Sequence, residues 1–268
     1  AHHVYVFHAM VSTHMIYPRG AFDHYDTIFC VGPHHLAELR RAEALDRRPA
    51  KRLVEAGYGR LERLYEDHRP LMDRPSRREG TRGLVLVAPS WGPGNILESC
   101  IRELVAALAE AGYQVVVRPH PEFRKRSPQL IDRLSREFAS QGRTSIEPEP
   151  LSDRSIHEAY VLITDWSGIA LEYAFGTERP VVFIDVPAKV RNPDYGRWGM
   201  VPVEMALRSE LGIVLRPGDV GRIAETVQHL MERRSDYRAR IQEHRSRYVY
   251  NFGRASEVGA REIANLCR

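Results

Sequence analysis

Hydrophobic residues in the larger, C-terminal part of the chain follow two alternating patterns. Short runs that are apolar throughout predict buried strands, and longer stretches with apolar residues three or four positions apart predict helices. We expect strands at residues 84–88, 113–118, 160–164, 181–184 and 212–215, and helices at 96–111, 128–141, 169–175 and 219–234. Strands that alternate with helices in this way form a mostly parallel sheet with helices on both faces.

The N-terminal part follows the same pattern less completely. It predicts strands at residues 4–7 and 27–31 and helical segments at 33–41 and 50–55. A part of about 75 residues is short for a complete Rossmann-like half. We therefore divide the chain into a partial N-terminal α/β segment (1–72), a polar linker rich in helix and strand breakers (73–82), a Rossmann-like domain (83–250) and a final helix (251–268) that packs back on the N-terminal segment.

Three loops at predicted strand ends hold the residues best suited to bind a ligand. In open parallel sheets, ligands bind at the carboxyl ends of the strands, where helix N-termini offer free N–H groups and partial positive charge. Residues 164–168 (TDWSG) place a hydroxyl and a glycine there, although simple helix capping explains Asp165 or Ser167 as well. In residues 118–122 (RPHPE), two prolines stiffen the loop that carries Arg118 and His120. The third loop, 88–95 (APSWGPGN), is also compatible with a plain capping turn.

Other histidines are candidates for acid–base chemistry or for metal binding. His8 follows a predicted strand, and an imidazole there can act as a general base because its pKa lies near the working pH. The cluster at residues 23–26 and the pair His34–His35 match no standard metal-ligand spacing. We expect solvated or helix-capping roles for them and no metal site.

The charge pattern limits the classes of partner. The chain carries 39 basic and 35 acidic residues, a net charge of +4, and the two signs are interleaved. This suits an anionic ligand or membrane surface, but without a stripe of basic and aromatic residues it argues against nucleic acid. The Arg-rich segment 231–247 is either a solvated helix face or a contact for anionic lipid. Lacking a long apolar run or a signal-peptide pattern, the sequence predicts a cytoplasmic protein, peripheral at most to the inner face of the membrane.

Several motifs in a fixed order carry a resemblance to a known family. They are Phe7-His8 after a strand and residues 21–32, 57–64, 88–91, 118–121, 162–168, 179–183 and 252–256. Taken together, they resemble the CDP-glycerol glycerophosphotransferase family, the polymerases and primases of teichoic acid and of some capsule polysaccharides. The resemblance spans nearly the whole chain.

The resemblance implies a glycosyltransferase-B fold, with two Rossmann-like domains and a site between them. The C-terminal domain would bind a CDP-linked donor, and the N-terminal one, incomplete here, would present a cell-envelope glycan or a lipid-linked acceptor. In-line attack on the donor's β-phosphorus would release CMP without a metal or other cofactor, with His8 as the base. The resemblance and the position of three loops at strand ends together give the candidates for the donor site. These are Ser90, Trp91, Arg118, His120, Thr164, Asp165, Ser167 and Gly168.

Two other functions remain open at this point. A nucleotide-sugar glycosyltransferase or 2-epimerase can be built on the same fold, because one fold hosts several chemistries. A nucleotide-binding accessory protein without catalytic activity is the third reading. Resemblance leads us to expect the transfer of a polyol phosphate such as glycerol phosphate.

Overall fold

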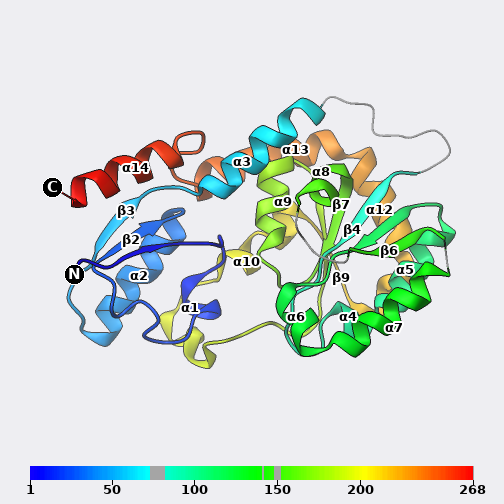
Figure 1. Cartoon of the computed structure of the whole chain (residues 1–268), viewed down its shortest axis with the longest axis horizontal. Coiled ribbons are helices and arrows are strands. Elements are labelled where there is room, and N and C mark those ends of the chain that lie inside the picture. Colours follow the sequence, from blue (N-terminus) through cyan, green and yellow to red (C-terminus); the bar gives the residue numbers. More distant parts are fainter. Residues whose placement is uncertain (73–81, 141, 148–151, 268) are drawn as a thin grey trace. The chain divides into compact units, whose positions relative to one another are not determined.

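The computed structural model describes residues 1–72, 82–140, 142–147 and 152–267, and the chain forms two compact units (Figure 1). Unit 1 consists of Ala1–Asp67, Val190–Leu207 and Gln242–Arg268, and unit 2 consists of His68–Lys189 and Arg208–Ile241. The division differs from the boundaries expected from the sequence, because a segment inside the expected C-terminal domain belongs to unit 1. Of the expected linker at 73–82, all but Arg82 lies outside the described residues.

Unit 2 is built around a parallel sheet of six strands in the order β6-β5-β4-β7-β8-β9. Numbered within the unit this is 3-2-1-4-5-6, the order of a complete Rossmann-like domain. The central strands are buried along nearly their whole length, which explains why their sequences are almost entirely apolar. The strands are β4 (Leu84–Val87), β5 (Gln114–Val117), β6 (Thr144–Ile146), β7 (Ala159–Thr164), β8 (Val181–Ile184) and β9 (Gly212–Leu215).

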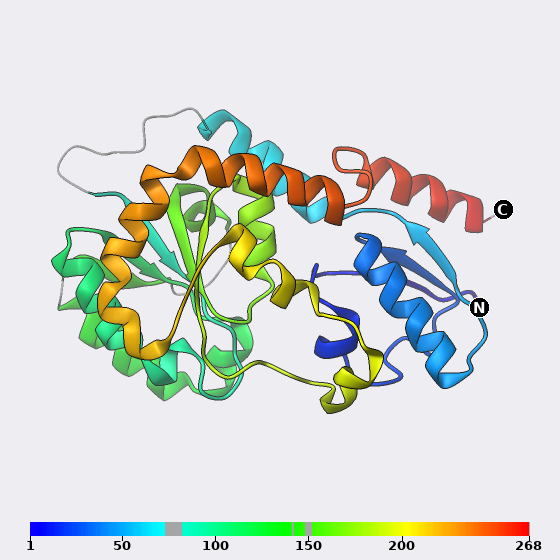
Figure 2. The same ribbon diagram turned by 180° about the vertical axis from the view of Figure 1, so that it is seen from behind.

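Helices cover both faces of this sheet, as expected. Helices α5 and α12 pack together on one face, and α9 lies on the other (Figures 1 and 2). The helix expected at 96–111 is two helices, because the backbone at Cys100 leaves the helical region (φ −136°). The helices are α4 (Ile96–Ser99), α5 (Ile101–Glu110), α6 (Pro121–Arg126), α7 (Pro128–Ala139), α8 (Arg154–Glu158), α9 (Ile169–Thr177), α11 (Arg208–Leu211), α12 (Ile223–Glu232) and the 3₁₀ turns η1 (Arg69–Leu71) and η3 (Pro217–Arg222).

Unit 1 contains a smaller parallel sheet in the order β1-β2-β3. Its strands are β1 (Val4–Val6), β2 (Thr27–Cys30) and β3 (Arg52–Glu55). The helical segment expected at 50–55 is wrong, because these residues pair with β2 in register Thr27↔Arg52 to Cys30↔Glu55. The helices are α1 (Thr13–Ile16), α2 (Pro33–Asp46), α3 (Gly59–His68), η2 (Pro193–Trp198), α10 (Val203–Ala206), α14 (Ala255–Leu266) and α13 (Arg234–Tyr248), in which the division between the units falls.

Two glycines let the C-terminal segment approach the sheet of unit 1. A Cβ on Gly32 would lie 1.8 Å from the carbonyl oxygen of Tyr248, and one on Gly57, which has φ +89°, would lie 2.3 Å from that of Tyr250. The backbone N–H of Tyr250 donates to Val31 at 2.9 Å. Helix α14 then covers the face of the sheet opposite α2 (Figure 1). The glycines of residues 21–32 and 57–64 therefore have a packing role.

A buried histidine in unit 2 makes the stability of this unit sensitive to acid. His68 is fully buried, and its Nδ1 lies 3.3 Å from Nδ1 of His157. Burial, with the charge of Arg179 and the neighbouring His157, lowers the pKa of His68 to about 3. The unfolded chain takes up this proton near its ordinary pKa of about 6.5, so stability is present above that pH and is lost as the pH falls toward 3.

We expect His68→Gln to reduce this loss. Each unit of pKa difference corresponds to about 1.4 kcal/mol, so the wild type should lose up to roughly 4 kcal/mol more than the variant between pH 6.5 and pH 3.5. Urea unfolding at a series of pH values measures this difference. His229→Gln, at an exposed position of α12, is the matched control. Parallel pH profiles for the wild type and His68→Gln would contradict the prediction.

Candidate functional site

The order of the strands in unit 2 places the candidate loops together. Strands β4 and β7 are neighbours and pair from Leu84↔Ala159 to Val87↔Ile163, and the chain order of the sheet reverses between them. Such a switch point leaves a crevice at the carboxyl ends of the strands. The loops at 88–95 and 165–168 follow these two strands, and the loop at 118–122 follows the adjacent β5.

Thr164 and Asp165 join two of these loops from inside the fold. The hydroxyl of Thr164 donates to the carbonyl of Ala88 at 2.6 Å. The Asp165 carboxylate accepts the backbone N–H groups of Ser90 at 2.8 Å and of Trp166 at 2.6 Å. Both side chains are buried, and burial raises the pKa of Asp165. Their geometry is that of positioning residues, which fix the loops after β4 and β7 against each other.

Ser167 and Gly168 lie at the open end of the same turn. Both are partly exposed, and Gly168 is the residue before helix α9. Within the described part of the chain, no acceptor takes the backbone N–H of Gly168 or of Ile169. Free N–H groups at the N-terminus of a nine-residue helix attract an anion. The alternative of a simple helix cap from Asp165 or Ser167 is wrong, since α9 has no side-chain cap.

The loop of His120 fixes the tautomer of its ring, and the surroundings of the ring keep it neutral. Its Nδ1 accepts the backbone N–H of Glu122 at 3.1 Å, which caps helix α6. Burial, followed by the charge of Lys189, lowers the pKa of His120 to about 4. The ring is therefore neutral near pH 7, with its proton on Nε2. No described residue accepts a hydrogen bond from Nε2, so this N–H is available to a ligand.

Trp91 gathers positive charge beside His120. The centroids of the two rings are 6.3 Å apart. The guanidinium carbon of Arg126 and Nζ of Lys189 each lie 4.8 Å from the centroid of the Trp91 ring. The sequence reasoning missed both cations, because they come from α6 and from the segment after β8. Basic and acidic residues are interleaved along the sequence, so nothing in it marks Arg126 or Lys189 as part of the site. Only Trp91, an aromatic residue in a strand-end loop, could be recognised from the sequence.

The structure gives Arg118 a different place. Its guanidinium donates to the carbonyl of Ser152 at 2.9 Å and to the hydroxyl of Ser155 at 3.0 Å, and it lies 3.5 Å from Glu147. These contacts join the end of β5 to the segments around β6 and α8. Arg118 is thus engaged within unit 2, and we do not assign it to phosphate.

The loop after β8 is braced by another arginine. Arg208 is buried, donates to the carboxylate of Asp185 at 2.8 Å and lies with its guanidinium carbon 4.0 Å from the centroid of Trp166. The indole N–H of Trp166 donates to the carbonyl of Val186 at 2.8 Å. The TDWSG turn is therefore fixed on two sides, through Asp165 to the loop after β4 and through Trp166 to the loop after β8.

His8 belongs to unit 1. It is exposed just beyond the carboxyl end of β1, and its backbone carbonyl accepts the hydroxyl of Tyr58 at 2.8 Å. Within the described residues, no hydrogen bond engages its imidazole. The loop that carries the ring is fixed, while the ring itself is accessible.

Of the remaining histidine candidates, His24 in the cluster at 23–26 is exposed, and the pair His34–His35 is structural. The pair His34–His35, expected to be solvated or to cap a helix, is instead shielded, with Nε2 contacts of 2.9 Å to the carbonyls of Met10 and Val11. Burial lowers the pKa of both rings. Among the described residues, no group of three or more His, Cys, Asp or Glu side chains is placed to hold a metal ion.

Helix α13 uses much of its positive charge within the chain. Arg238 donates to Glu178 at 2.7 Å, and Arg245 lies 4.3 Å from the ring centroid of Phe252. Arg247 forms an ion pair with Glu243, and Arg233, just before the helix, forms one with Asp236. None of the described helices combines the length and hydrophobicity required to cross a bilayer.

Comparison with known proteins identifies the fold. The wall teichoic acid polymerase TagF has a TM-score of 0.59 and 15% sequence identity, over 100% of this chain and 69% of that chain. The UDP-GlcNAc 2-epimerase of Neisseria meningitidis bound to UDP-GlcNAc has a TM-score of 0.54 and 12% identity, over 90% of this chain and 62% of the epimerase chain. Anabaena HepE with UDP and glucose has a TM-score of 0.52 and 12% identity, over 98% and 71%.

At these identities the likeness shows the fold alone. The chain has the α/β glycosyltransferase-B fold with parallel sheets, as expected, and its N-terminal sheet is small. It spans about three-fifths of the length of two further TagF chains. No protein-family model matches the sequence, and no curated protein matches it either.

Proposed function

We propose that unit 2 binds the diphosphate of a nucleotide-linked donor at the carboxyl edge of its sheet. The observation that carries the proposal is the neutral His120, whose Nε2–H is directed to no protein acceptor among the described residues and which stands beside Trp91 and Lys189. A neutral N–H donor next to a cation suits a phosphate oxygen. The proposal predicts that donor affinity depends on His120 without depending on its protonation near pH 7.

The N-terminus of α9 offers the second half of this phosphate site. The N–H groups of Gly168 and Ile169 add two donors and the positive end of a helix dipole. Asp165 and Thr164 hold this turn against the loop of Ser90 from behind. We therefore assign direct contacts to His120, Gly168 and Ser167, and a positioning role to Asp165 and Thr164.

We infer further that the reaction is the transfer of a polyol phosphate from a CDP-linked donor. The support is the ordered resemblance to CDP-glycerol glycerophosphotransferases, together with the fold shared with TagF. The acceptor oxygen would form a bond to the β-phosphorus, and the bond from that phosphorus to the bridging oxygen would break. CMP would leave with the bridging oxygen, and the acceptor proton would pass to His8.

A UDP-linked sugar is the alternative donor. Its support is that HepE, with UDP and glucose, and a 2-epimerase, with UDP-GlcNAc, share the fold. An accessory protein that binds the nucleotide without turnover is a further outcome of the same tests. A glycan- or lipid-linked acceptor, a cytoplasmic location and a membrane contact by α13 remain predictions.

His120→Ala should weaken donor binding by about 10–100-fold, since a hydrogen bond to a charged group contributes roughly 1.5–3 kcal/mol. Isothermal titration calorimetry of the wild type and the variant with CDP-glycerol, UDP-glucose and UDP-GlcNAc measures the effect. The same titrations show whether the site accepts a cytidine or a uridine nucleotide. His229→Ala, at an exposed position of α12, is the matched control. Unchanged affinity in His120→Ala would remove His120 from the site, and binding of UDP compounds alone would overturn the CDP assignment.

A further inference from the structure

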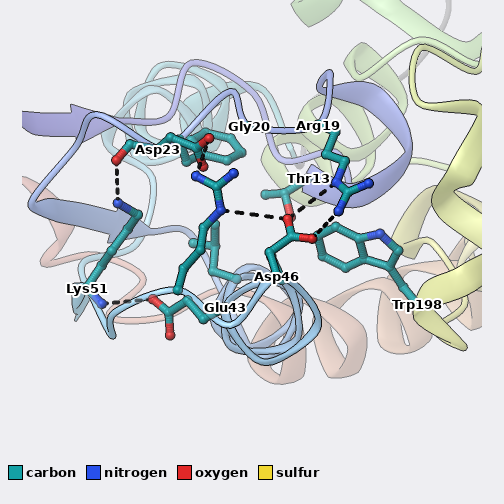
Figure 3. A pocket seen from close by; sticks show the side chains of 12 residues that line it. Thr13, Arg19, Gly20, Asp23, Glu43, Asp46, Lys51 and Trp198 are labelled. Carbon is teal, nitrogen blue, oxygen red and sulfur yellow. Dashed lines mark hydrogen bonds and ion pairs between the residues drawn. The ribbon is translucent and has the colours of Figure 1, made fainter.

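Unit 1 contains a small pocket at the edge of its sheet opposite His8. The pocket is lined by residues of the loop before β2, of the loop before β3 and of helix α2, together with Thr13 and Trp198 (Figure 3). The two loops lie at the amino ends of their strands, whereas His8 follows the carboxyl end of β1. Neither the proposed donor site nor the proposed base is part of this pocket.

The charged side chains of the pocket balance one another. Three are basic, and three are acidic. Arg19 forms an ion pair with Asp46 (Figure 3). Arg48 forms one with Asp23, and Nε of Arg48 lies 3.8 Å from Asp46. Nζ of Lys51 donates to the carbonyls of Asp23 at 2.9 Å and Tyr25 at 2.7 Å. A charged ligand would have to break one of these pairs, so the pocket favours a neutral one.

The alternation of donors and acceptors suits hydroxyl groups. A guanidinium can only donate hydrogen bonds, and an ionised carboxylate can only accept them. The ion pair with Arg19 lowers the pKa of Asp46, so this carboxyl is ionised. A hydroxyl does both, and it can bridge Arg19 and Asp46 or Arg48 and Asp23 without displacing either partner. Neighbouring hydroxyls on one carbon chain or ring match such an array.

An aromatic wall completes the pocket. The ring of Trp198 stacks on the ring of His14, with centroids 5.3 Å apart and planes at 29°. The Nε–H of Arg41 donates to the backbone carbonyl of Trp198 at 3.1 Å. His14 is buried and lies 3.1 Å from Glu38. Trp198 is therefore fixed before a ligand arrives, which reduces the entropy cost of binding. The apolar C–H groups of a polyol or sugar pack well on such a ring.

The size of the pocket limits the ligand. Its cavity volume is about 50 Å³. A site for one water molecule needs roughly 10–15 Å³ of occupied space, so this cavity admits several water molecules, which is the scale of one small polyol. A single polyol or part of one sugar ring fits, and a nucleotide does not.

We propose that this pocket binds one neutral polyol or sugar unit, at a place separate from the site of transfer. The unit would be held between the Arg19–Asp46 and Arg48–Asp23 pairs, against Trp198. The inference stands on unit 1 alone and does not depend on which donor, if any, unit 2 accepts.

Saturation-transfer difference NMR with glycerol and glucose as probes tests the proposal. Ala42, on α2, lines the pocket, so Ala42→Leu should fill it, whereas Ala44→Leu adds the same group at an exposed position of the same helix. We expect saturation transfer to the C–H protons of a probe in the wild type and in Ala44→Leu, and at least a tenfold weaker Kd in Ala42→Leu. Circular dichroism verifies the folding of both variants.

A second variant and a competitor keep the outcomes distinct. Trp198→Leu keeps an apolar side chain but removes the aromatic wall, and it should weaken binding even if Ala42→Leu fails to fold. Saturating CDP-glycerol should leave the glucose signal unchanged, since the pocket is separate from the donor site. Absence of transfer in the wild type, equal signals in all variants, competition by CDP-glycerol, or tighter binding of glycerol 3-phosphate than of glycerol would each overturn the proposal.

Discussion

Replacement of His8 by alanine should lower kcat for transfer from CDP-glycerol by about 10²–10⁴-fold, the usual contribution of a general base. The exposed imidazole beyond β1 is removed, and the carbonyl that binds Tyr58 remains. Donor affinity should stay within about twofold of the wild type, because the proposed phosphate contacts all belong to unit 2. Steady-state release of CMP, with titration of the donor, measures both quantities.

His24→Ala is the matched control for this experiment, since His24 is also an exposed histidine of unit 1. Its kcat should equal that of the wild type. If His8→Ala keeps full turnover, including slow hydrolysis of the donor, His8 is not the base. If neither the wild type nor His8→Ala turns over a donor that both bind, the accessory reading replaces the transferase.

Asp165→Ala should lower the free energy of unfolding of unit 2 by about 2–5 kcal/mol, because the buried N–H groups of Ser90 and Trp166 lose their acceptor. Asp165→Asn keeps one acceptor oxygen and should lose less. The loops after β4 and β7 would also separate, so donor affinity should fall with stability. Urea unfolding followed by tryptophan fluorescence measures the first effect.

Asp132→Ala provides the control, since Asp132 is exposed on helix α7. It should unfold within about 0.5 kcal/mol of the wild type, as most surface substitutions do. Equal stability of Asp165→Ala and Asp132→Ala would mean that the Asp165 carboxylate does not hold the two loops together.

The strands and most helices of unit 2 could be predicted because local pattern and tertiary structure agree there. Residues 84–87 and 181–184 are apolar throughout, and residues 159–163 nearly so, as buried parallel strands are. The break at Cys100 could not be predicted, because residues 96–111 keep a helical pattern across it. The strand at Arg52–Glu55 was missed because it is short and only partly buried, and pairing with β2 decides its conformation.

The candidate site could be predicted only as far as strand ends reveal it. The loops of Trp91, His120 and Gly168 follow from sheet topology. The sequence does not show which residues of these loops contact a ligand and which hold the loops in place. That depends on side-chain direction: Asp165 faces inward to Ser90, and Arg118 turns to Glu147. The approach of Lys189 to Trp91 links residues almost a hundred positions apart, and no local pattern encodes it.

The place of Val190–Leu207 in unit 1 depends on similar distant contacts. Asn192 donates to the carbonyl of His14 at 2.8 Å, and Glu204 accepts the N–H of Ser12 at 2.9 Å. Nothing in the sequence around Asn192 or Glu204 indicates these contacts. These contacts hold the segment that places Trp198 at the pocket of unit 1, so the pocket could not be predicted from the sequence.

A crystal structure of the protein with CDP-glycerol tests the central claim most directly. We predict that an oxygen of the diphosphate lies within hydrogen-bonding distance of Nε2 of His120, and that another accepts the N–H of Gly168 or Ile169. A diphosphate bound elsewhere, with Nε2 of His120 and the start of α9 both turned to solvent, would contradict the assignment.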